Sequence, residues 1–295
     1  MEIHQLTYFV AVSETGSFSR AAERCNVAQP SLSQQIMKLE AELGEPLFDR
    51  LRRRVVLTEA GSRLLPHATA ILAELHDIKQ NVGQEADTGV GSLTVSFIPT
   101  IAPFLLPRVI RRFSQDFPEA KLEVHENLTE EIVRDLIDGK LDVGITSMPI
   151  RNRLIRTQEL LTEPLLVASS RFYEITQRAS IHVKELDDFP FIALSEMHCL
   201  GDQIQSFCYQ QRLDLQIVCH TAQLSTLQNC IAMGLGVSLV PQALALEDDS
   251  GQIVYRNLSD ATPERKIAAA THKRRLQSHL ARQFIQIVRE EYPVG

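Results

Sequence analysis

Residues 17–43 read SFSRAAERCNVAQPSLSQQIMKLEAEL, and this stretch decides the fold of the amino-terminal part of the chain. Ser17 can cap a short helix in which two adjacent alanines allow another helix to approach closely. After a turn, Pro30 suits the first turn of a longer helix, where its missing N–H is not needed. The buried face of that helix is predicted from apolar side chains at helical spacing: Leu32, Ile36, Leu39 and Leu43.

The opposite face of this second helix carries small hydroxyl and amide side chains, among them Ser31, Gln34 and Gln35. A further amphipathic helix is expected over residues 3–13, so the pattern is that of a helix-turn-helix. Because glutamine can pair with adenine and serine can bond to base edges or phosphates, such a helix can read DNA. A small helical bundle with a solvated polar face is the competing interpretation at this point.

Residues 48–58, FDRLRRRVVLT, read as a tight hairpin whose tip is basic. A basic wing directly after an exposed Ser/Gln helix supplies phosphate contacts beside a base-reading element. The combination favours DNA binding and predicts a winged helix-turn-helix domain over residues 1–58.

A long helical pattern follows over residues 59–88, which we interpret as a linker and dimerisation helix. A helix packed only on its own domain is the alternative. A dimerising helix implies self-association and a palindromic double-stranded promoter site. The predicted seam repeats at heptad spacing along Leu64, Ala68, Ile71, Leu75, Ile78 and Val82.

Alternating strands and helices fill residues 89–295 and predict an α/β regulatory domain with a mostly parallel sheet. We expect two lobes, one formed by residues 92–162 plus 266–295 and the other by residues 163–265. The cleft between such lobes is the expected ligand site. The fold class is therefore α+β multidomain, with a two-lobed domain like that of periplasmic binding proteins.

The net charge of −7 argues against a generally basic nucleic-acid binder but leaves a local basic element possible. We find neither a signal peptide nor an apolar stretch long enough to span a membrane, so a cytoplasmic protein without membrane contact is expected. Hydrolase, phosphate-loop and dinucleotide motifs are absent, so no enzyme activity and no cofactor are expected. The five cysteines lack the close pairs of a zinc site, so no metal is expected.

Residues 196–210, EMHCLGDQIQSFCYQ, place Cys199 just before the start of a predicted helix and Cys208 nine residues later. A helix amino terminus favours a thiolate, whereas a nearby ionised Asp202 would disfavour one, so the sequence leaves the sign of the pKa shift open. Nine helical residues separate the two Cα atoms by about 13 Å. A disulfide tolerates roughly 7 Å, so the helix must unravel before the two sulfurs can bond. Two unrelated cysteines without chemistry are the alternative, and Cys219 and Cys230 are expected to be ordinary buried residues.

Residues 1–88 resemble LysR-type transcriptional regulators through the pattern FVAV..TGSFSRAAE...VAQPSLSQQI..LE.ELG..LFDR....V.LTEAG. The resemblance implies that the recognition helix faces the major groove and that the basic wing contacts the phosphates. The implied DNA-binding residues are Gln29, Ser31, Ser33 and Gln34 on the helix, and Arg50, Arg52 and Arg53 on the wing.

The remaining chain resembles the peroxide-sensing members of that family in IPTIAPFLLP, HCLGDQ....FC, LSTLQN and GLGVSLVP. The resemblance implies that Cys199 is the peroxidatic thiol and that Cys208 resolves it. Two positions depart from the pattern, since Lys266 follows Arg265 where a second arginine is usual, and Gly201 replaces a larger residue. The implied effector pocket comprises Thr100, Thr129, His198, Asp202 and Lys266.

The expected function is thus a regulator that senses hydrogen peroxide through a thiol-disulfide switch and activates oxidative-stress genes. We expect it to act as a dimer or tetramer, on promoter DNA and with RNA polymerase. One alternative is a regulator of the same family that binds a small organic anion in the cleft. A thiol peroxidase is the alternative of a different class.

Overall fold

The computed structural model describes residues 1–51, 54–82, 89–178 and 180–292. The chain divides into two compact units, one formed by Met1–Gly83 with Ile137–Lys140 and the other by Gln84–Leu136 with Leu141–Gly295. We call them the amino-terminal and carboxy-terminal units and describe each by itself. Among the described residues, no helix has the length and apolar character needed to cross a membrane.

The amino-terminal unit is a winged helix-turn-helix, as the sequence predicts. Its helices are α1 (Ile3–Thr15), α2 (Phe18–Arg24) and α3 (Gln29–Leu43), and its wing pairs β1 (Phe48–Leu51) antiparallel with β2 (Arg54–Leu57). The Ser17 side chain accepts a hydrogen bond from the Arg20 backbone N–H and so caps α2. Leu32, Ile36 and Leu39 are fully buried, but Leu43 is 43 % exposed because α3 ends there, before Gly44 turns the chain.

The linker helix α4 (Glu59–Val82) continues through Pro66. Its predicted heptad seam divides into two parts. Leu64 and Ala68 pack on the core of the amino-terminal unit, whereas Ile71 and Ile78 are 40 % and 49 % exposed. Two described residues of the outer half, Ile71 and Ile78, are therefore exposed apolar side chains.

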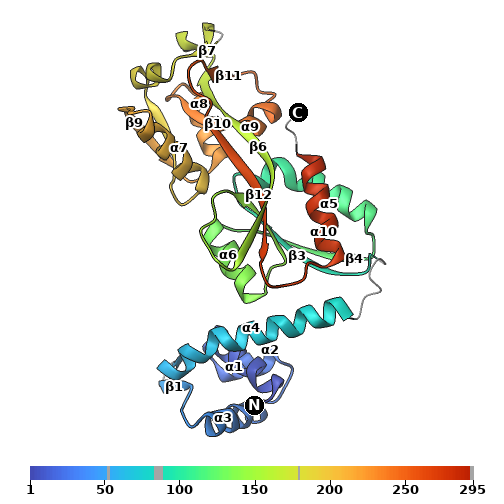
Figure 1. Ribbon diagram of the computed structural model, residues 1–295. Helices are drawn as coiled ribbons and strands as arrows, with labels where there is room; N and C mark the ends of the chain where they lie inside the picture. Colours follow the sequence, from blue (N-terminus) through green and yellow to red (C-terminus); the bar gives the residue numbers. More distant parts are fainter. Residues whose placement is uncertain (52–53, 83–88, 179, 293–295) are drawn as a thin grey trace. The chain divides into compact units, whose positions relative to one another are not determined.

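The carboxy-terminal unit is built on a mixed sheet with the strand order β4-β3-β5-β12-β6-β11-β7, in which β10 also pairs with β6 (Figure 1). The expectation of a mostly parallel sheet is wrong, because β6 and β12 run antiparallel to each other and β12 also runs antiparallel to β5. The strands are β3 (Gly91–Phe97), β4 (Ala120–Glu126), β5 (Val143–Ser147), β6 (Ile155–Ser170), β7 (Ser180–Ile181), β10 (Ser238–Pro241), β11 (Ile253–Leu258) and β12 (Glu264–His272).

The strands β6 and β12 join two lobes of this unit. In one lobe α10 (His279–Glu291) packs against α5 (Ala102–Asp116) and β3, with α6 (Thr129–Asp138) between β4 and β5 in the chain. The other lobe adds a parallel pair, β8 (Phe191–Leu194) and β9 (Ile217–Thr221), with α7 (Cys199–Gln210), α8 (Leu224–Ala232) and α9 (Gln242–Glu247). The predicted lobe boundaries, after residues 162 and 265, fall within β6 and β12.

Candidate functional site

The recognition helix α3 presents the predicted polar side chains to solvent. Gln29, Ser31 and Gln34 are exposed, and Ser33 is half-buried and accepts a hydrogen bond of 2.8 Å from Gln29 Nε2. Gln35 turns inward instead, where its Oε1 accepts a hydrogen bond from Gln5 Nε2 at 3.2 Å. The helix therefore offers hydroxyl and amide groups of the kind that contact base edges.

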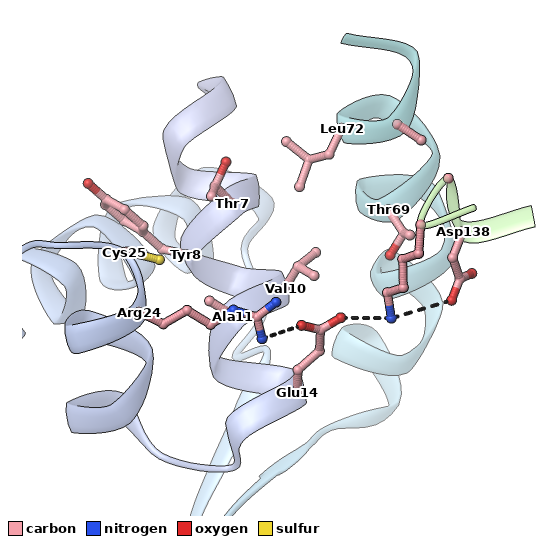
Figure 2. A pocket seen from close by; sticks show the side chains of 13 residues that line it. Thr7, Tyr8, Val10, Ala11, Glu14, Arg24, Cys25, Thr69, Leu72 and Asp138 are labelled. Atoms are coloured by element: carbon pink, nitrogen blue, oxygen red, sulfur yellow. Dashed lines mark ion pairs between the residues drawn. The ribbon is translucent and has the colours of Figure 1, made fainter. Parts of the chain in front are cut away.

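The wing is described only in part. The backbone of Arg50 belongs to β1, whereas Arg52 and Arg53 lie outside the described residues, so their predicted phosphate contacts stay a prediction. Arg24 of α2 forms an ion pair with Glu14 of α1, with 2.6 Å between Nη1 and Oε2. Figure 2 marks this pair with a dashed line. This ion pair ties α1 to the helix that precedes the recognition helix.

In the carboxy-terminal unit, α7 begins at Cys199 itself, earlier than the sequence predicts, because Cys199 is the first residue of the helix and does not precede it; His198 is the N-cap. The helix start packs tightly on the end of β8. A Cβ atom on Gly201 would lie 2.3 Å from the Ser195 carbonyl oxygen and 2.7 Å from that of Leu194. The unusual glycine noted in the sequence is therefore required by the close approach of α7 to this turn.

Cys199 is half-buried, with its thiol directed across the cleft toward the other lobe. It is hydrogen-bonded to the Thr129 side chain of α6 and to the backbone at Ser147 of β5 and Leu200. Burial raises the pKa of Cys199, and this effect outweighs the lowering by Arg265 and by those hydrogen bonds. The sequence left open the direction in which the pKa of Cys199 is shifted. In this conformation the pKa is raised, because desolvation disfavours the thiolate.

The positive charge that lowers the pKa of this thiol belongs to a buried network. Arg265, whose side chain is fully buried, donates from Nε to Glu163 Oε2 at 2.6 Å and from Nη1 to Thr100 Oγ1 at 3.1 Å. Glu163 also accepts hydrogen bonds from the Tyr292 hydroxyl at 2.9 Å and from the Ala243 backbone N–H at 2.8 Å. A buried ion pair of this kind is tolerated only when its remaining donors and acceptors are satisfied, as they are here.

Lys266 does not belong to the pocket, and that expectation is corrected. Its side chain is exposed and its Nζ lies 3.1 Å from Glu159 Oε2 on β6. Side chains alternate along a strand, so Arg265 points inward and Lys266 outward on β12. Asp202 is also exposed, in the first turn of α7, and is not among the groups that shift the pKa of Cys199.

Two other predicted pocket residues do come together. Thr100 and His198, 2 % and 8 % exposed, line a cavity of about 250 Å³ between the lobes. Glu126 at the end of β4 and Gln223 before α8 also line it. Thr129 does not line this cavity; its hydroxyl lies 3.2 Å from that of Thr146, and its side chain interacts with the Cys199 thiol. A small polar molecule therefore fits near the start of α7.

Cys208 lies two and a half turns along α7 and is 6 % exposed within the apolar core of its lobe. Burial raises its pKa to about 11, with a further contribution from Asp187. Because both cysteines belong to one helix, about 13 Å of helix separates them, and all five cysteines of the described chain are free. The sequence expectation that they cannot bond in the helical state agrees with this geometry.

A second cavity, of about 300 Å³, lies between α7 and the β8–β9 pair. Its walls are mostly apolar and include Ile204, Leu215 and Cys208 itself. Cys208 therefore borders this cavity as well as the apolar core of its lobe.

Comparisons with known proteins assign the family. Residues 3–62 match the model for the bacterial regulatory helix-turn-helix protein, lysR family, and residues 86–293 match the LysR substrate binding domain. The chain belongs to the LysR family of transcriptional regulators.

Several relatives and solved structures of this family are similar over most of the chain. The dual regulator OxyR of Escherichia coli K12 is 35 % identical, with 90 % of this chain and 88 % of the relative covered. HcaR, the Hca operon activator of the same strain, is 32 % identical, with 98 % of each covered. A full-length OxyR variant of Pseudomonas aeruginosa superposes with a TM-score of 0.80 at 30 % identity, covering 100 % of this chain and 95 % of that one.

A hydrogen-peroxide-bound OxyR mutant of Corynebacterium glutamicum is also similar, with a TM-score of 0.65 at 29 % identity. It covers 99 % of this chain and 94 % of that chain. Overall identity alone does not separate OxyR proteins from HcaR, since both lie within a few per cent.

The residues that sequence reasoning missed in this LysR regulator are those that support Cys199 from a distance. Glu163 and Tyr292 carry no local signal, because long-range pairing of β6 with β12 and the packing of the chain end bring them to Arg265. In the sequence, Arg265 has no signal of its own beyond its position next to Lys266. Strand alternation at residues 264–272 was the signal that could have placed Arg265 inward.

Proposed function

We propose that this LysR-family regulator senses hydrogen peroxide, with Cys199 as the peroxidatic thiol and Cys208 as the resolving thiol. The observation that carries the proposal is their placement at the two ends of one helix. The Cys199 thiol interacts with Thr129 and Arg265, and Cys208 is buried in the core. OxyR relatives and a peroxide-bound OxyR structure support the choice of signal.

Two thiols and one molecule of hydrogen peroxide supply all the atoms and electrons of the reaction. The Cys199 thiolate attacks one oxygen of hydrogen peroxide, the O–O bond breaks, and the leaving oxygen departs as water after protonation. Cys208 then attacks the resulting sulfenic sulfur, the S–S bond forms and a second water leaves. Because the helix holds the sulfurs too far apart, α7 must unravel before this second step.

A refolded α7 is the switch that carries the signal to DNA in this proposal. The exposed face of α3 would read a palindromic promoter through Gln29, Ser31, Ser33 and Gln34, and the wing with Arg50 would contact phosphates. Self-association into a dimer or tetramer through α4 would present two such helices. The regulator would act in the cytoplasm as an activator of oxidative-stress genes, by way of RNA polymerase.

The proposal is tested by footprinting the full-length protein on its promoter before and after stoichiometric hydrogen peroxide. We expect the wild-type footprint to change and the Cys199→Ser footprint to stay as in the reduced state. Ser206→Ala, an exposed change in the same helix, is the matched control and should respond like the wild type. A peroxide response retained by Cys199→Ser would rule out this role for the thiol.

A regulator of a small organic ligand is the second candidate, favoured by the 250 Å³ cavity at Thr100 and His198 and by the similarity to HcaR. The carboxylate of Glu126 in the cavity wall disfavours an anion. Such a ligand would change the footprint of Cys199→Ser as well as that of the wild type. A thiol peroxidase would instead consume peroxide steadily with a thiol reductant, whereas we propose one oxidation for each signalling event.

A further inference from the structure

Two cysteines outside the proposed switch lie side by side in the second lobe. Cys219 belongs to β9 and Cys230 to α8, and the Cys230 thiol is hydrogen-bonded to that of Cys219. The sequence predicted both to be ordinary buried residues, but the structure leaves each of them only half-buried. They are therefore two neighbouring thiols within reach of a small oxidant.

The fold brings these sulfurs together through adjacent elements. Cys219 pairs in register with the buried Ile192 of β8, so its side chain shares the inner face of the strand pair with Thr221. After a short turn, α8 packs back on β9, and both cysteines border the same apolar core. Their proximity is thus fixed by a packed strand and helix.

We propose that Cys219 and Cys230 form a second dithiol-disulfide site, which closes without any refolding of the backbone. One thiolate attacks hydrogen peroxide, the O–O bond breaks, and the first water leaves to give a sulfenic acid. The neighbouring thiol then attacks that sulfur, forming the S–S bond and releasing the second water. The two thiols are oxidised by two electrons and peroxide is reduced to two water molecules.

This pair differs from Cys199 and Cys208 in what limits the bond. For Cys199 and Cys208 the helix must unravel, whereas Cys219 and Cys230 belong to a strand and a helix that already pack together, and their thiols are near enough to interact. The product would join α8 covalently to β9, next to the β8 strand that leads into α7. Oxidation at this second site would therefore hold α8 and β9 together and would leave α7 free to refold.

Trypsin separates the two pairs, which makes the proposal directly testable. Cleavage after Lys184, Arg212 and Arg256 places Cys199 and Cys208 on the peptide 185–212 and Cys219 and Cys230 on the peptide 213–256. Full-length Cys199→Ser protein is treated with hydrogen peroxide and its remaining thiols are alkylated. The protein is then digested with trypsin in the absence of reductant, and the peptide masses are measured by mass spectrometry. We expect the peptide 213–256 to carry no alkyl group and to be lighter by two hydrogen atoms than the reduced, unalkylated peptide.

Cys219→Ser and Cys230→Ser, each in the Cys199→Ser background, are the matched controls, and each should keep an alkylatable thiol on the peptide 213–256. The wild-type protein in the same experiment reports the Cys199–Cys208 bond separately on the peptide 185–212. Full alkylation of Cys219 and Cys230 after peroxide would overturn the proposal. A sulfinic acid at either position, or a bond to the peptide 185–212 or to a second chain, would overturn it as well.

Discussion

Arg265 and Lys266 are adjacent cations on β12 with opposite environments. Arg265 is fully buried and hydrogen-bonded to Glu163 and Thr100, whereas Lys266 pairs at the surface with Glu159. Removing one partner of a buried pair leaves an uncompensated charge that costs about 3–5 kcal/mol. An exposed pair contributes about 0–1 kcal/mol. The two residues therefore allow a matched comparison within one strand.

We expect Arg265→Gln to lower the free energy of unfolding by about 3 kcal/mol, because Glu163 loses its buried partner. It should also slow the reaction of Cys199 with peroxide, since the cation that favours the thiolate is gone. Urea denaturation and the initial rate of thiol loss measure the two effects. Lys266→Gln should change stability by less than about 1 kcal/mol and leave the rate unaltered. Equal effects of the two changes would contradict this assignment.

The raised pKa of Cys199 predicts a pH dependence for its reaction. Only the thiolate attacks peroxide, so the rate should increase with pH through about pH 7 to 9, approaching its plateau above the ordinary thiol pKa. Thr129→Val removes a hydrogen bond that lowers the pKa of Cys199. The curve of rate against pH should therefore shift to higher pH than in the wild type. Stopped-flow rates from pH 6 to 10 would check both, with Thr226→Val on α8 as the exposed control. A flat wild-type profile would show that the thiolate is already formed at neutral pH.

At the scale of the element, the start of α7 depends on the missing side chain at Gly201. Alanine is favoured over glycine in a helix by about 1 kcal/mol, but overpacking costs about 1–3 kcal/mol. Here the added Cβ would meet the Ser195 carbonyl oxygen at 2.3 Å, a contact with backbone that cannot rotate away. The steric cost should therefore exceed the gain in helix propensity.

We expect Gly201→Ala to destabilise the protein by about 1–2 kcal/mol and to displace Cys199 from Thr129. The urea midpoint and the rate of Cys199 alkylation measure these two effects. Ser206→Ala, on the exposed side of the same helix, gains helix propensity without a clash and should be neutral or slightly stabilising. If Gly201→Ala stabilised the protein, the backbone of the turn before α7 would have to shift at little cost to make room for the added Cβ atom.

These elements also show what the sequence could predict. The recognition helix was predicted from local signals, because Pro30 and the apolar side chains at helical intervals lie within a few positions of one another. The antiparallel course of β6 and β12 was missed, since it depends on pairing between strands about a hundred positions apart. For the same reason Thr100 and His198 were predicted from resemblance, whereas Glu163 and Tyr292 were found only in the structure.

At the scale of the whole molecule, charge and assembly are linked. The chain carries a net charge of −7, and residues 1–67 hold eight basic and eight acidic side chains, so one copy has little general attraction for DNA. Specific binding then depends on placing two recognition helices at once, because linked sites raise the effective concentration of the second contact. The exposed apolar side chains of α4, Ile71 and Ile78, are the described feature best suited to that assembly.

Ile78→Asp should therefore weaken self-association at least tenfold and weaken binding to a palindromic site more than binding to a half-site. Burying one isoleucine contributes about 1.5–3 kcal/mol, and a two-fold symmetric contact uses the residue from both copies. Sedimentation velocity and electrophoretic mobility shifts with the two DNA lengths measure these effects. Ser62→Asp introduces the same charge on nearly the opposite side of α4 and should leave the oligomer intact. If both variants dissociate alike, added charge alone explains the loss, and the exposed stripe is not the contact.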